Sequence, residues 1–232
     1  MGQIPLKKAT PSGVSTEPND RREEILEAAT VLFAEEGFTD SLTQQLADRL
    51  GVGKGTLYRY FPSKSDLFLA AVDRLMKKLT TQADQNLEDV TDPLDRISIA
   101  VRTYHDFFEN HPEFAELLVQ ERAQFKDRAK PTYFAHRETR VERWRELYRS
   151  LIKQGRVRDI PVNRITDVIS AAVYGSMFLN HFGGRDESFA ASADDILDII
   201  FHGILTREAS EDRAAIPTAQ PGAADPGGCH RS

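Results

Sequence analysis

Apolar residues recur at spacings of three and four along most of this chain, which is the period of an amphipathic helix. No segment shows the strict alternation of apolar and polar residues that a half-buried strand requires. The pattern therefore predicts an all-α protein of about nine helices. These are expected over residues 20–36, 41–50, 54–60, 63–81, 92–110, 114–118, 131–155, 161–182 and 188–207.

Several polar residues, prolines and glycines mark the expected ends of these helices. Ser41 and Gln44 stand three apart, which is the spacing of a capping box at a helix N-terminus. Asp92 followed by Pro93 suits the start of another helix, because proline is favoured at the first helical position. Gly155 ends the long helix that follows Pro131.

Both ends of the chain lack the helical period. Residues 1–19 and 209–232 contain repeated Pro and Gly without periodic apolar positions, and we expect both tails to be disordered. Between them we expect a small N-terminal domain over residues 20–80. A larger helical domain should occupy residues 81–208.

Residues 46–64, LADRLGVGKGTLYRYFPSK, form the most informative segment. Apolar residues from Leu46 to Leu50 give one face of a short helix. Gly51 follows at the position where a helix ends in a left-handed residue, and Val52 can anchor the turn in a small core. This pattern predicts a helix-turn-helix.

The second helix of this motif has one polar and one apolar face. Leu57 and Phe61 should point inward. The donors on the opposite face are Lys54, Thr56, Tyr58 and Arg59. A helix of this length and polarity fits the major groove of DNA, whereas Tyr58 and Tyr60 could also serve as core aromatics of a small domain.

A phosphate-binding P-loop is a weak alternative for residues 53–56, Gly-Lys-Gly-Thr. Asp48 stands where the first glycine of that motif belongs, and the segment follows a helix instead of a strand. We therefore do not expect nucleotide binding.

The net charge of −6 is unevenly divided along the chain. Residues 41–64 hold four basic residues against one acidic residue, or +3, whereas residues 81–207 hold 17 basic against 21 acidic residues, or −4. Phosphate neutralisation needs a local positive surface, not a positive chain. This distribution favours a protein that touches DNA at one small patch.

The helix-turn-helix and its flanks resemble the DNA-binding domain of the TetR family of bacterial repressors, over about residues 21–78. The further residues that carry the resemblance are Arg22, Ile25, Leu26, Ala28, Ala29, Leu32, Phe33, Gly37, Phe38, Pro62, Ser63, Lys64, Leu67 and Phe68. The resemblance implies a transcriptional regulator that binds double-stranded DNA at a palindromic operator. It also implies which residues meet the bases and phosphates, namely Thr43, Gln44, Lys54, Gly55, Thr56, Tyr58, Arg59, Tyr60 and Lys64.

In this family a cavity in the C-terminal domain takes up a small molecule, which shifts the DNA-binding heads. Aromatic residues at helical spacing are candidates for its wall, although such a stripe also suits plain core. The candidates are Tyr104, Phe107, Phe108, Trp144, Tyr148, Tyr174 and Phe178. The last two helices are apolar beyond one core-facing stripe, so we expect a homodimer through them.

Other kinds of site find little support in the sequence. The histidines show no metal-ligand spacing, and the single cysteine, Cys229, lies in the tail, so neither a metal nor a cofactor is expected. Five arginines between residues 137 and 149 alternate with glutamates, which is typical of a solvated, ion-paired helix face. With no membrane span or secretory signal, we expect a cytoplasmic protein.

The sequence thus predicts a homodimeric repressor that a small hydrophobic effector releases from its operator. One alternative is a related regulator controlled by a partner protein. An all-α enzyme is the other alternative, but no convergent nucleophile and base are visible, so no catalytic residues are expected.

Overall fold

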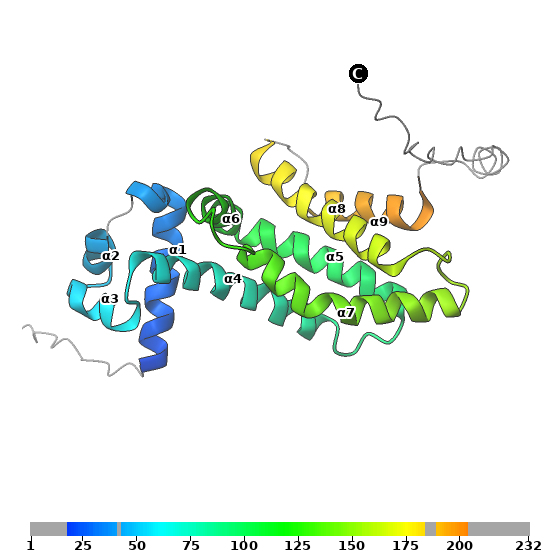
Figure 1. Ribbon diagram of the computed structural model, residues 1–232, viewed down its shortest axis with the longest axis horizontal. Coiled ribbons are helices and arrows are strands. Elements are labelled where there is room, and N and C mark those ends of the chain that lie inside the picture. Colours follow the sequence, from blue (N-terminus) through cyan, green and yellow to red (C-terminus); the bar gives the residue numbers. More distant parts are fainter. Residues whose placement is uncertain (1–17, 41–42, 184–188, 204–232) are drawn as a thin grey trace, which may run out of the picture.

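The computed structural model describes residues 18–40, 43–183 and 189–203, which form nine helices (Figure 1). No strand occurs in this part of the chain, and the predicted all-α fold is confirmed. The helices are α1 (Pro18–Asp40), α2 (Thr43–Arg49), α3 (Lys54–Tyr60), α4 (Lys64–Asn86), α5 (Pro93–Asn110), α6 (Pro112–Gln124), α7 (Thr132–Lys153), α8 (Val162–Phe182) and α9 (Phe189–His202).

Several helix boundaries differ from the sequence prediction. The helix predicted to end near residue 81 continues as α4 to Asn86, because Leu79 and Ala83 extend its buried stripe. The short helix predicted over 114–118 is the longer α6, which Pro112 begins at a position where proline is favoured. Within α1, Gly37 has a φ of 76°, so the regular helix ends there.

Some predicted features lie outside the described residues. These are the Ser41 cap, residues 1–17 and residues 209–232, which include Cys229. The last helix, predicted to reach residue 207, ends at His202, because Gly203 has a φ of 76°. The other predicted caps can be compared directly. Asp92 caps α5 through the Leu94 amide at 2.7 Å, and Ser63 caps α4 through the Asp66 amide at 3.0 Å.

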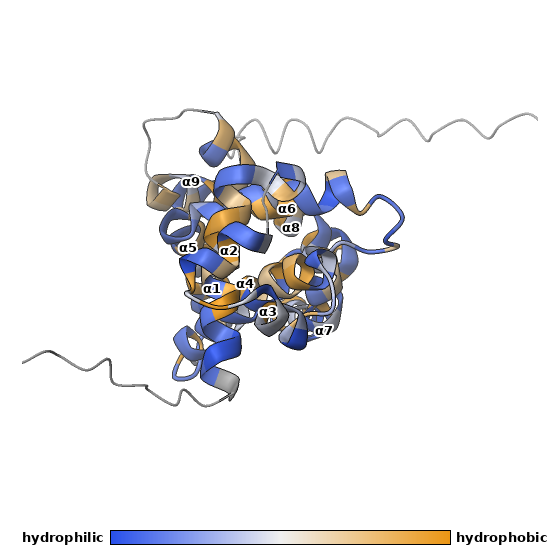
Figure 2. Ribbon diagram, turned by 90° about the vertical axis from the view of Figure 1, so that its left-hand side faces the viewer, coloured by the Kyte–Doolittle hydropathy of each residue, from blue (hydrophilic) through white to orange (hydrophobic). Residues whose placement is uncertain are grey.

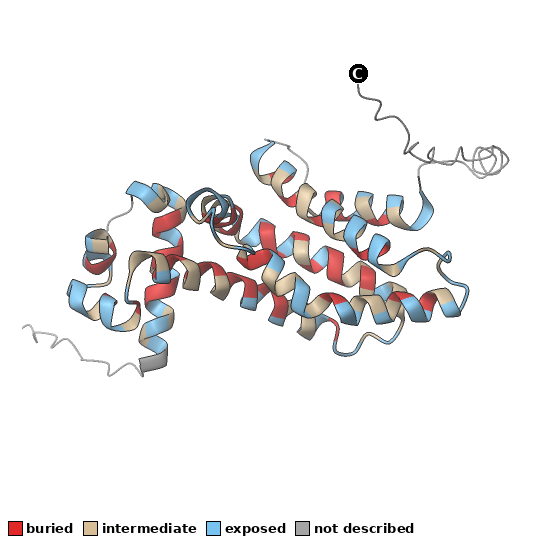
Figure 3. Cartoon of the chain, in the orientation of Figure 1, coloured by how far each residue is buried: buried red, intermediate tan, exposed pale blue. Residues whose placement is uncertain are grey.

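A head and a body make up the described molecule (Figure 1). The head contains α1, α2, α3 and the first turns of α4, and the body contains the rest of α4 with α5 to α9. The views show hydrophilic and hydrophobic residues along the same helices, with buried faces turned inward (Figures 2 and 3). The boundary predicted at residue 80 falls within α4, so one continuous helix belongs to both parts.

The hydrophobic core runs without a break from the head into the body. Leu57 and Phe68 from the head share it with Phe108 and Met177 from the body. Three aromatic rings connect the parts further, because Phe125 after α6 lies 5.3 Å from Phe38 and 5.6 Å from Phe68 between centroids. The head is therefore packed against α6 as well as joined covalently to α4.

A buried carboxylate fixes the junction between α6 and α7. Glu121 is 1% exposed and accepts hydrogen bonds from the amide of Thr132 at 2.9 Å and from its hydroxyl at 2.7 Å. Arg128 neutralises the same carboxylate. Pro131 makes no side-chain cap for α7. Glu121 of α6 therefore accepts the hydrogen bond of the free Thr132 amide at the N-terminus of α7.

Among the described residues, no helix is both long enough and apolar enough to cross a membrane.

Candidate nucleic-acid interface and internal cavity

The turn between α2 and α3 depends on one glycine. Gly51 has a φ of 62°, a conformation that glycine adopts at low cost. The amide of Val52 then bonds to the carbonyl of Ala47 at 2.9 Å and closes the turn. Leu57, at 2% exposure, seats α3 in the head core, so the opposite face of α3 is directed outward.

The outer face of α3 carries most of the DNA contacts that the resemblance implies. Lys54, Gly55, Tyr58 and Arg59 are exposed there, and Thr56 is half-buried. Tyr58 is 44% exposed, which argues against a purely structural role. Tyr60, in contrast, is half-buried and packs against the head core, so its ring also stabilises the fold.

The first turn of α2 lies beside this face. The hydroxyls of Thr43 and Tyr58 are 3.3 Å apart, so these two predicted contacts form one continuous surface. Gln44 instead donates to Asp48 at 2.7 Å along its own helix and must turn outward to reach DNA.

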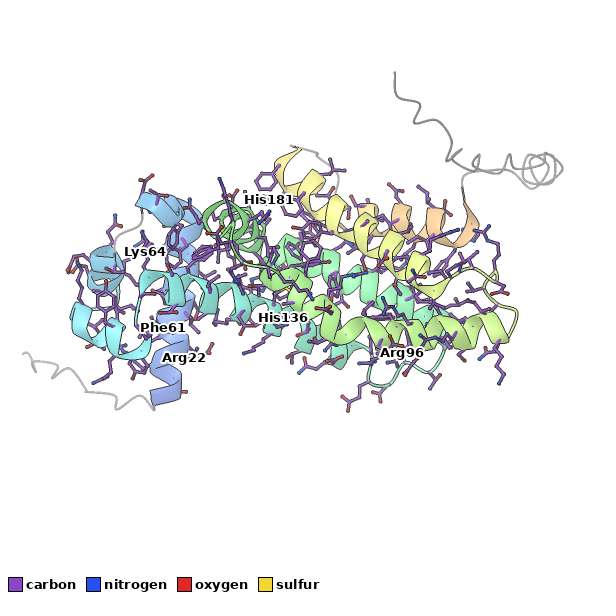
Figure 4. The ribbon with its side chains drawn as sticks, in the orientation of Figure 1. Arg22, Phe61, Lys64, Arg96, His136 and His181 are labelled. Carbon is purple, nitrogen blue, oxygen red and sulfur yellow. The ribbon has the colours of Figure 1, made fainter. Side chains whose placement is uncertain are left out.

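Lys64 is placed differently from a freely extended surface lysine. Its Nζ donates to the carbonyl of Thr39 at 3.3 Å and lies 4.9 Å from the ring centroid of Phe38, near the end of α1 (Figure 4). Partial burial lowers the pKa of Lys64, although the charge of Asp40 opposes this. The ammonium group therefore links α4 to α1 in addition to any contact with a phosphate.

The body contains a cavity of about 110 Å³ among α4, α5, α7 and α8. Tyr104, Trp144 and Tyr148, three of the seven predicted aromatics, line it. Phe107 and Phe108 pack instead with Phe114 in the core. Tyr174 and Phe178 stand in an aromatic row outside the lining, with centroids 4.8 Å apart.

Four further polar lining residues come from α7 and were not predicted as wall residues. These are Tyr133, His136, Arg137 and Arg140. Alternating charge on a helix suggests exposure, so nothing in the charge pattern indicated that part of this face turns inward. Periodicity was the available signal, because Tyr133, Arg137, Arg140 and Trp144 share helical spacing of three and four.

The predicted solvated, ion-paired face of α7 is therefore only partly right. Arg145 and Arg149 do pair with Glu142 on the same helix, at 3.3 and 2.8 Å. Three other arginines cross to neighbouring helices. Arg140 and Arg143 pair with Asp84 on α4, and Arg137 pairs with Asp167 on α8.

The histidines of the body make hydrogen bonds instead of forming a metal cluster. His136 bonds to Asp73 of α4 at 2.7 Å, and His181 bonds to Glu116 of α6 at 3.0 Å (Figure 4). The described part of the chain contains no group of three potential His, Cys, Asp or Glu ligands. His136 thus connects the cavity wall with α4.

Comparison with known proteins identifies the head. Residues 25–71 match the sequence profile of the bacterial regulatory proteins of the tetR family, which includes α2, α3 and the turn between them. The head therefore belongs to the TetR family of bacterial regulatory proteins. As a TetR-family protein it is a DNA-binding transcriptional regulator with a helix-turn-helix, and its relatives are regulators, not enzymes.

Similarity to individual TetR-family proteins extends over the body. The chain is 28% identical to nucleoid occlusion factor SlmA of Vibrio campbellii over 186 residues, or 75% of this chain and 90% of that protein. It is 25% identical to the regulator PfmR of Thermus thermophilus, whose structure aligns with a TM-score of 0.65 over 78% of this chain and 99% of that one. The structure of FadR from Bacillus subtilis in complex with stearoyl-CoA aligns with a TM-score of 0.64 over 79% and 99%, at 15% identity, and shows the shared fold.

Proposed function

We propose that this regulator is a cytoplasmic repressor that leaves a palindromic operator when a small effector enters the cavity. One observation carries the proposal: α4 belongs to both sites. Phe68 of α4 is buried in the head core, while Met76 and Thr80 of the same helix line the cavity. A rearrangement of the cavity wall therefore moves the element that supports α3.

The proposed DNA surface comprises the first turn of α2, the outer face of α3 and the start of α4. Exposed groups near the N-terminus of α3 would meet base edges in the major groove, and flanking hydroxyl and ammonium groups would meet phosphates. The supporting observation is the adjacency of Thr43 and Tyr58 together with the exposure of Lys54 and Arg59. Residues 20–80 would then act as the DNA-binding domain and residues 81–208 as the effector and dimerisation domain.

A homodimer through α8 and α9 would place two heads on the two half-sites. Val168, Leu179 and Phe182 of α8 and Ile199 and Phe201 of α9 are large apolar residues with exposed fractions from 40% to 61%. The α8 residues lie at helical spacing with Ala171 and Gly175 between them, which makes one apolar stripe on the surface. A second copy that covers the same stripe by two-fold symmetry would remove this surface from water.

The fold supports a small-molecule effector in the cavity. The structural relative FadR is described as a complex with stearoyl-CoA, so at least one regulator of this fold binds an organic molecule. If occupancy of the cavity favours a spacing of the heads that does not fit DNA, the effector weakens DNA binding by the same factor by which DNA weakens effector binding.

Fluorescence provides a direct test, because Trp144 is the only tryptophan of the chain and lines the cavity. Operator fragments enriched from random DNA by the purified protein would be labelled for anisotropy. An effector should change Trp144 emission and release this DNA over the same concentration range. A compound that saturates the Trp144 signal yet leaves DNA affinity unchanged would contradict the release mechanism, since equal affinity for both states shifts nothing.

Control by a partner protein is the second candidate, and the same DNA surface would serve it. It is favoured by the similarity to a nucleoid occlusion factor over 90% of that protein's length, because that relative's name describes no small-molecule response. Under this alternative, a broad set of metabolites would leave both the Trp144 signal and the DNA affinity unchanged.

A further inference from the structure

The ionisable side chains of the cavity wall have one sign of charge. His136, Arg137 and Arg140 line the cavity, whereas no Asp or Glu of the described chain does so. The other lining residues are apolar, aromatic or hydroxyl-bearing. A ligand in this space therefore meets cationic donors and no carboxylate.

The carboxylates that balance these arginines lie outside the lining. Asp84 on α4 accepts from Arg140 and, at 3.0 Å, from Arg143, and these bonds hold its pKa below the usual range. Asp167 on α8 accepts from Nη2 of Arg137 at 2.6 Å. Each arginine of the wall thus has a carboxylate partner outside the lining, so a ligand in the cavity meets the guanidinium groups and not the carboxylates.

Three tyrosine hydroxyls add further donors. Tyr104, Tyr133 and Tyr148 line the cavity, and Tyr133 and Tyr148 are each only 5% exposed. None of the three hydroxyl oxygens is among the fully buried polar atoms of the described chain that lack a partner, so these donors remain accessible from the cavity. Burial raises the pKa of all three phenols, so each keeps its proton and remains a donor. A ligand in the cavity could accept hydrogen bonds from these hydroxyls.

These donors are not evenly spread through the cavity. Tyr133, His136, Arg137 and Arg140 come from the first half of α7, which lies toward the head. Trp144 and Tyr148 come from its second half and pack with Ile97 and Ile165 in an apolar cluster. The cavity thus has a cationic end near the head and an apolar end away from it.

The enclosed volume favours a small occupant. A cavity of about 150 Å³ holds a single benzene molecule, and this one is smaller at about 110 Å³. A drug-sized ligand needs roughly 300 Å³ or more. Because the cavity is also open on one side, it can take one ring or a short branched chain whose polar end lies at the opening.

From this geometry we propose that the cavity selects a compact monocarboxylic acid, with its carboxylate held by Arg140, Arg137 and the hydroxyls of Tyr104 and Tyr133 and its apolar part against Trp144. The inference rests on the proposed effector site and specifies the class of compound that occupies it. A neutral ligand would forfeit the charge-assisted bonds, and a cation would be repelled by both guanidinium groups.

Benzoate, benzamide and benzamidine test the proposal because they share one ring and differ in charge. The full chain would be titrated with each while Trp144 emission and thermal unfolding are followed. We expect benzoate to bind about tenfold or more tighter than benzamide, as a charged hydrogen bond requires, and benzamidine to produce no signal. Equal binding of the three, tighter binding of benzamidine, or no binding of benzoate would overturn the proposal.

Two arginines provide a matched pair of variants. Arg140 and Arg143 both bond to Asp84, but only Arg140 lines the cavity. Arg140→Gln should weaken benzoate binding about tenfold or more and leave benzamide unaffected, whereas Arg143→Gln should change neither by more than about twofold. If both variants lost benzoate affinity equally, the effect would come from the contact between α4 and α7, and the proposal would be overturned. Tyr104→Phe, which keeps the ring, should also weaken benzoate selectively.

Size and regulation are tested separately. Octanoate and stearoyl-CoA should bind more weakly than benzoate, and tighter binding of either would overturn the compact class. If benzoate binds selectively and leaves DNA affinity unchanged, the ligand class stands and the proposed release mechanism fails. If a neutral or cationic compound binds and releases DNA instead, the release mechanism stands and the acid proposal fails.

Discussion

Gln120 on α6 donates a hydrogen bond to the backbone carbonyl of Phe33 on α1, with Nε2 and O 2.8 Å apart. This bond joins the body to the head at a point other than α4. The Oε1 atom of the same amide is buried without a partner, so the side chain is kept in place by this one bond and its packing. The head is therefore held from two sides, by α4 and by α6.

Replacement of Gln120 by Leu should lower the free energy of unfolding by about 1–2 kcal/mol, because the partly buried Phe33 carbonyl loses this donor. Chemical denaturation would measure the change. Gln124→Leu is the matched control, since Gln124 lies one turn further along α6 and reaches only the exposed Thr39 hydroxyl at 3.3 Å. Equal effects of the two replacements would show that the Phe33 contact contributes little.

Lys64→Ala should weaken binding to operator and unrelated DNA alike and reduce the salt dependence of binding by about one unit, because one phosphate contact is lost. Thr56→Ala should instead reduce discrimination between the two DNAs. Anisotropy titrations over a range of salt concentrations would separate these effects. Since Lys64 also bonds to Thr39, circular dichroism must first show that the variant remains folded. Lys153→Ala, at the far end of α7, is the control and should change neither property.

Leu179→Glu should dissociate the proposed dimer at micromolar concentration, because it would place an unpaired carboxylate in an apolar seam. Light scattering would report the mass. Val119→Glu makes the same change at an exposed apolar residue of α6, 41% exposed, and should leave a dimer intact. A dimeric Leu179→Glu variant would indicate that another surface forms the dimer.

His105 should make the stability of the protein depend on pH. The ring is fully buried, with Nδ1 2.8 Å from the Val101 carbonyl and Nε2 2.8 Å from the Ser176 hydroxyl. Burial lowers the pKa of His105 from its ordinary 6.5, although the Val101 bond and Asp106 oppose this. Below pH 6.5 the unfolded chain takes up a proton that the native state does not, so stability is lost as pH falls from there toward the lower native pKa.

Thermal unfolding between pH 7.5 and pH 5 should show this loss, with a slope of at most about 1.4 kcal/mol per pH unit from this group. His105→Gln should be less stable at pH 7.5 but should lose less on acidification. The exposed His202 gives the control, because His202→Gln should follow the unmodified protein. Identical pH profiles for all three proteins would exclude a contribution from His105.

The head was predictable from sequence because its signals are local. Gly51 requires a positive φ, Leu57 must point inward, and the predicted limits of α3 agree with the structure. The surface of α3 follows from these few constraints. The position of Lys64 did not follow, because its bond to Thr39 spans 25 residues and depends on how α1 ends.

The cavity was less predictable because it depends on which helix faces meet. Phe107 and Trp144 both lie on apolar stripes, yet one packs against Phe114 in the core and the other lines the cavity. From the sequence, Arg140 is expected on the solvent-exposed face of its helix. Its position at the cavity depends on a bond to Asp84, which lies 56 residues away in the chain. The helical period shows which residues share the apolar face of a helix, but it does not show which other helix packs against that face.

Gly175 of α8 affects both the stability of the single copy and the proposed association of two copies. A glycine inside a helix costs about 1 kcal/mol relative to alanine, yet no described atom beyond its chain neighbours and its own helix backbone lies within 4 Å of the place where its Cβ would stand. Nothing described within a single copy therefore requires this residue. A methyl group there would strengthen the isolated helix and, if α8 meets its symmetry mate at this point, hold the two copies apart. Stability of the single copy thus favours alanine at position 175, whereas close contact between two copies favours glycine. The single substitution Gly175→Ala would therefore separate the effect on folding from the effect on dimerisation.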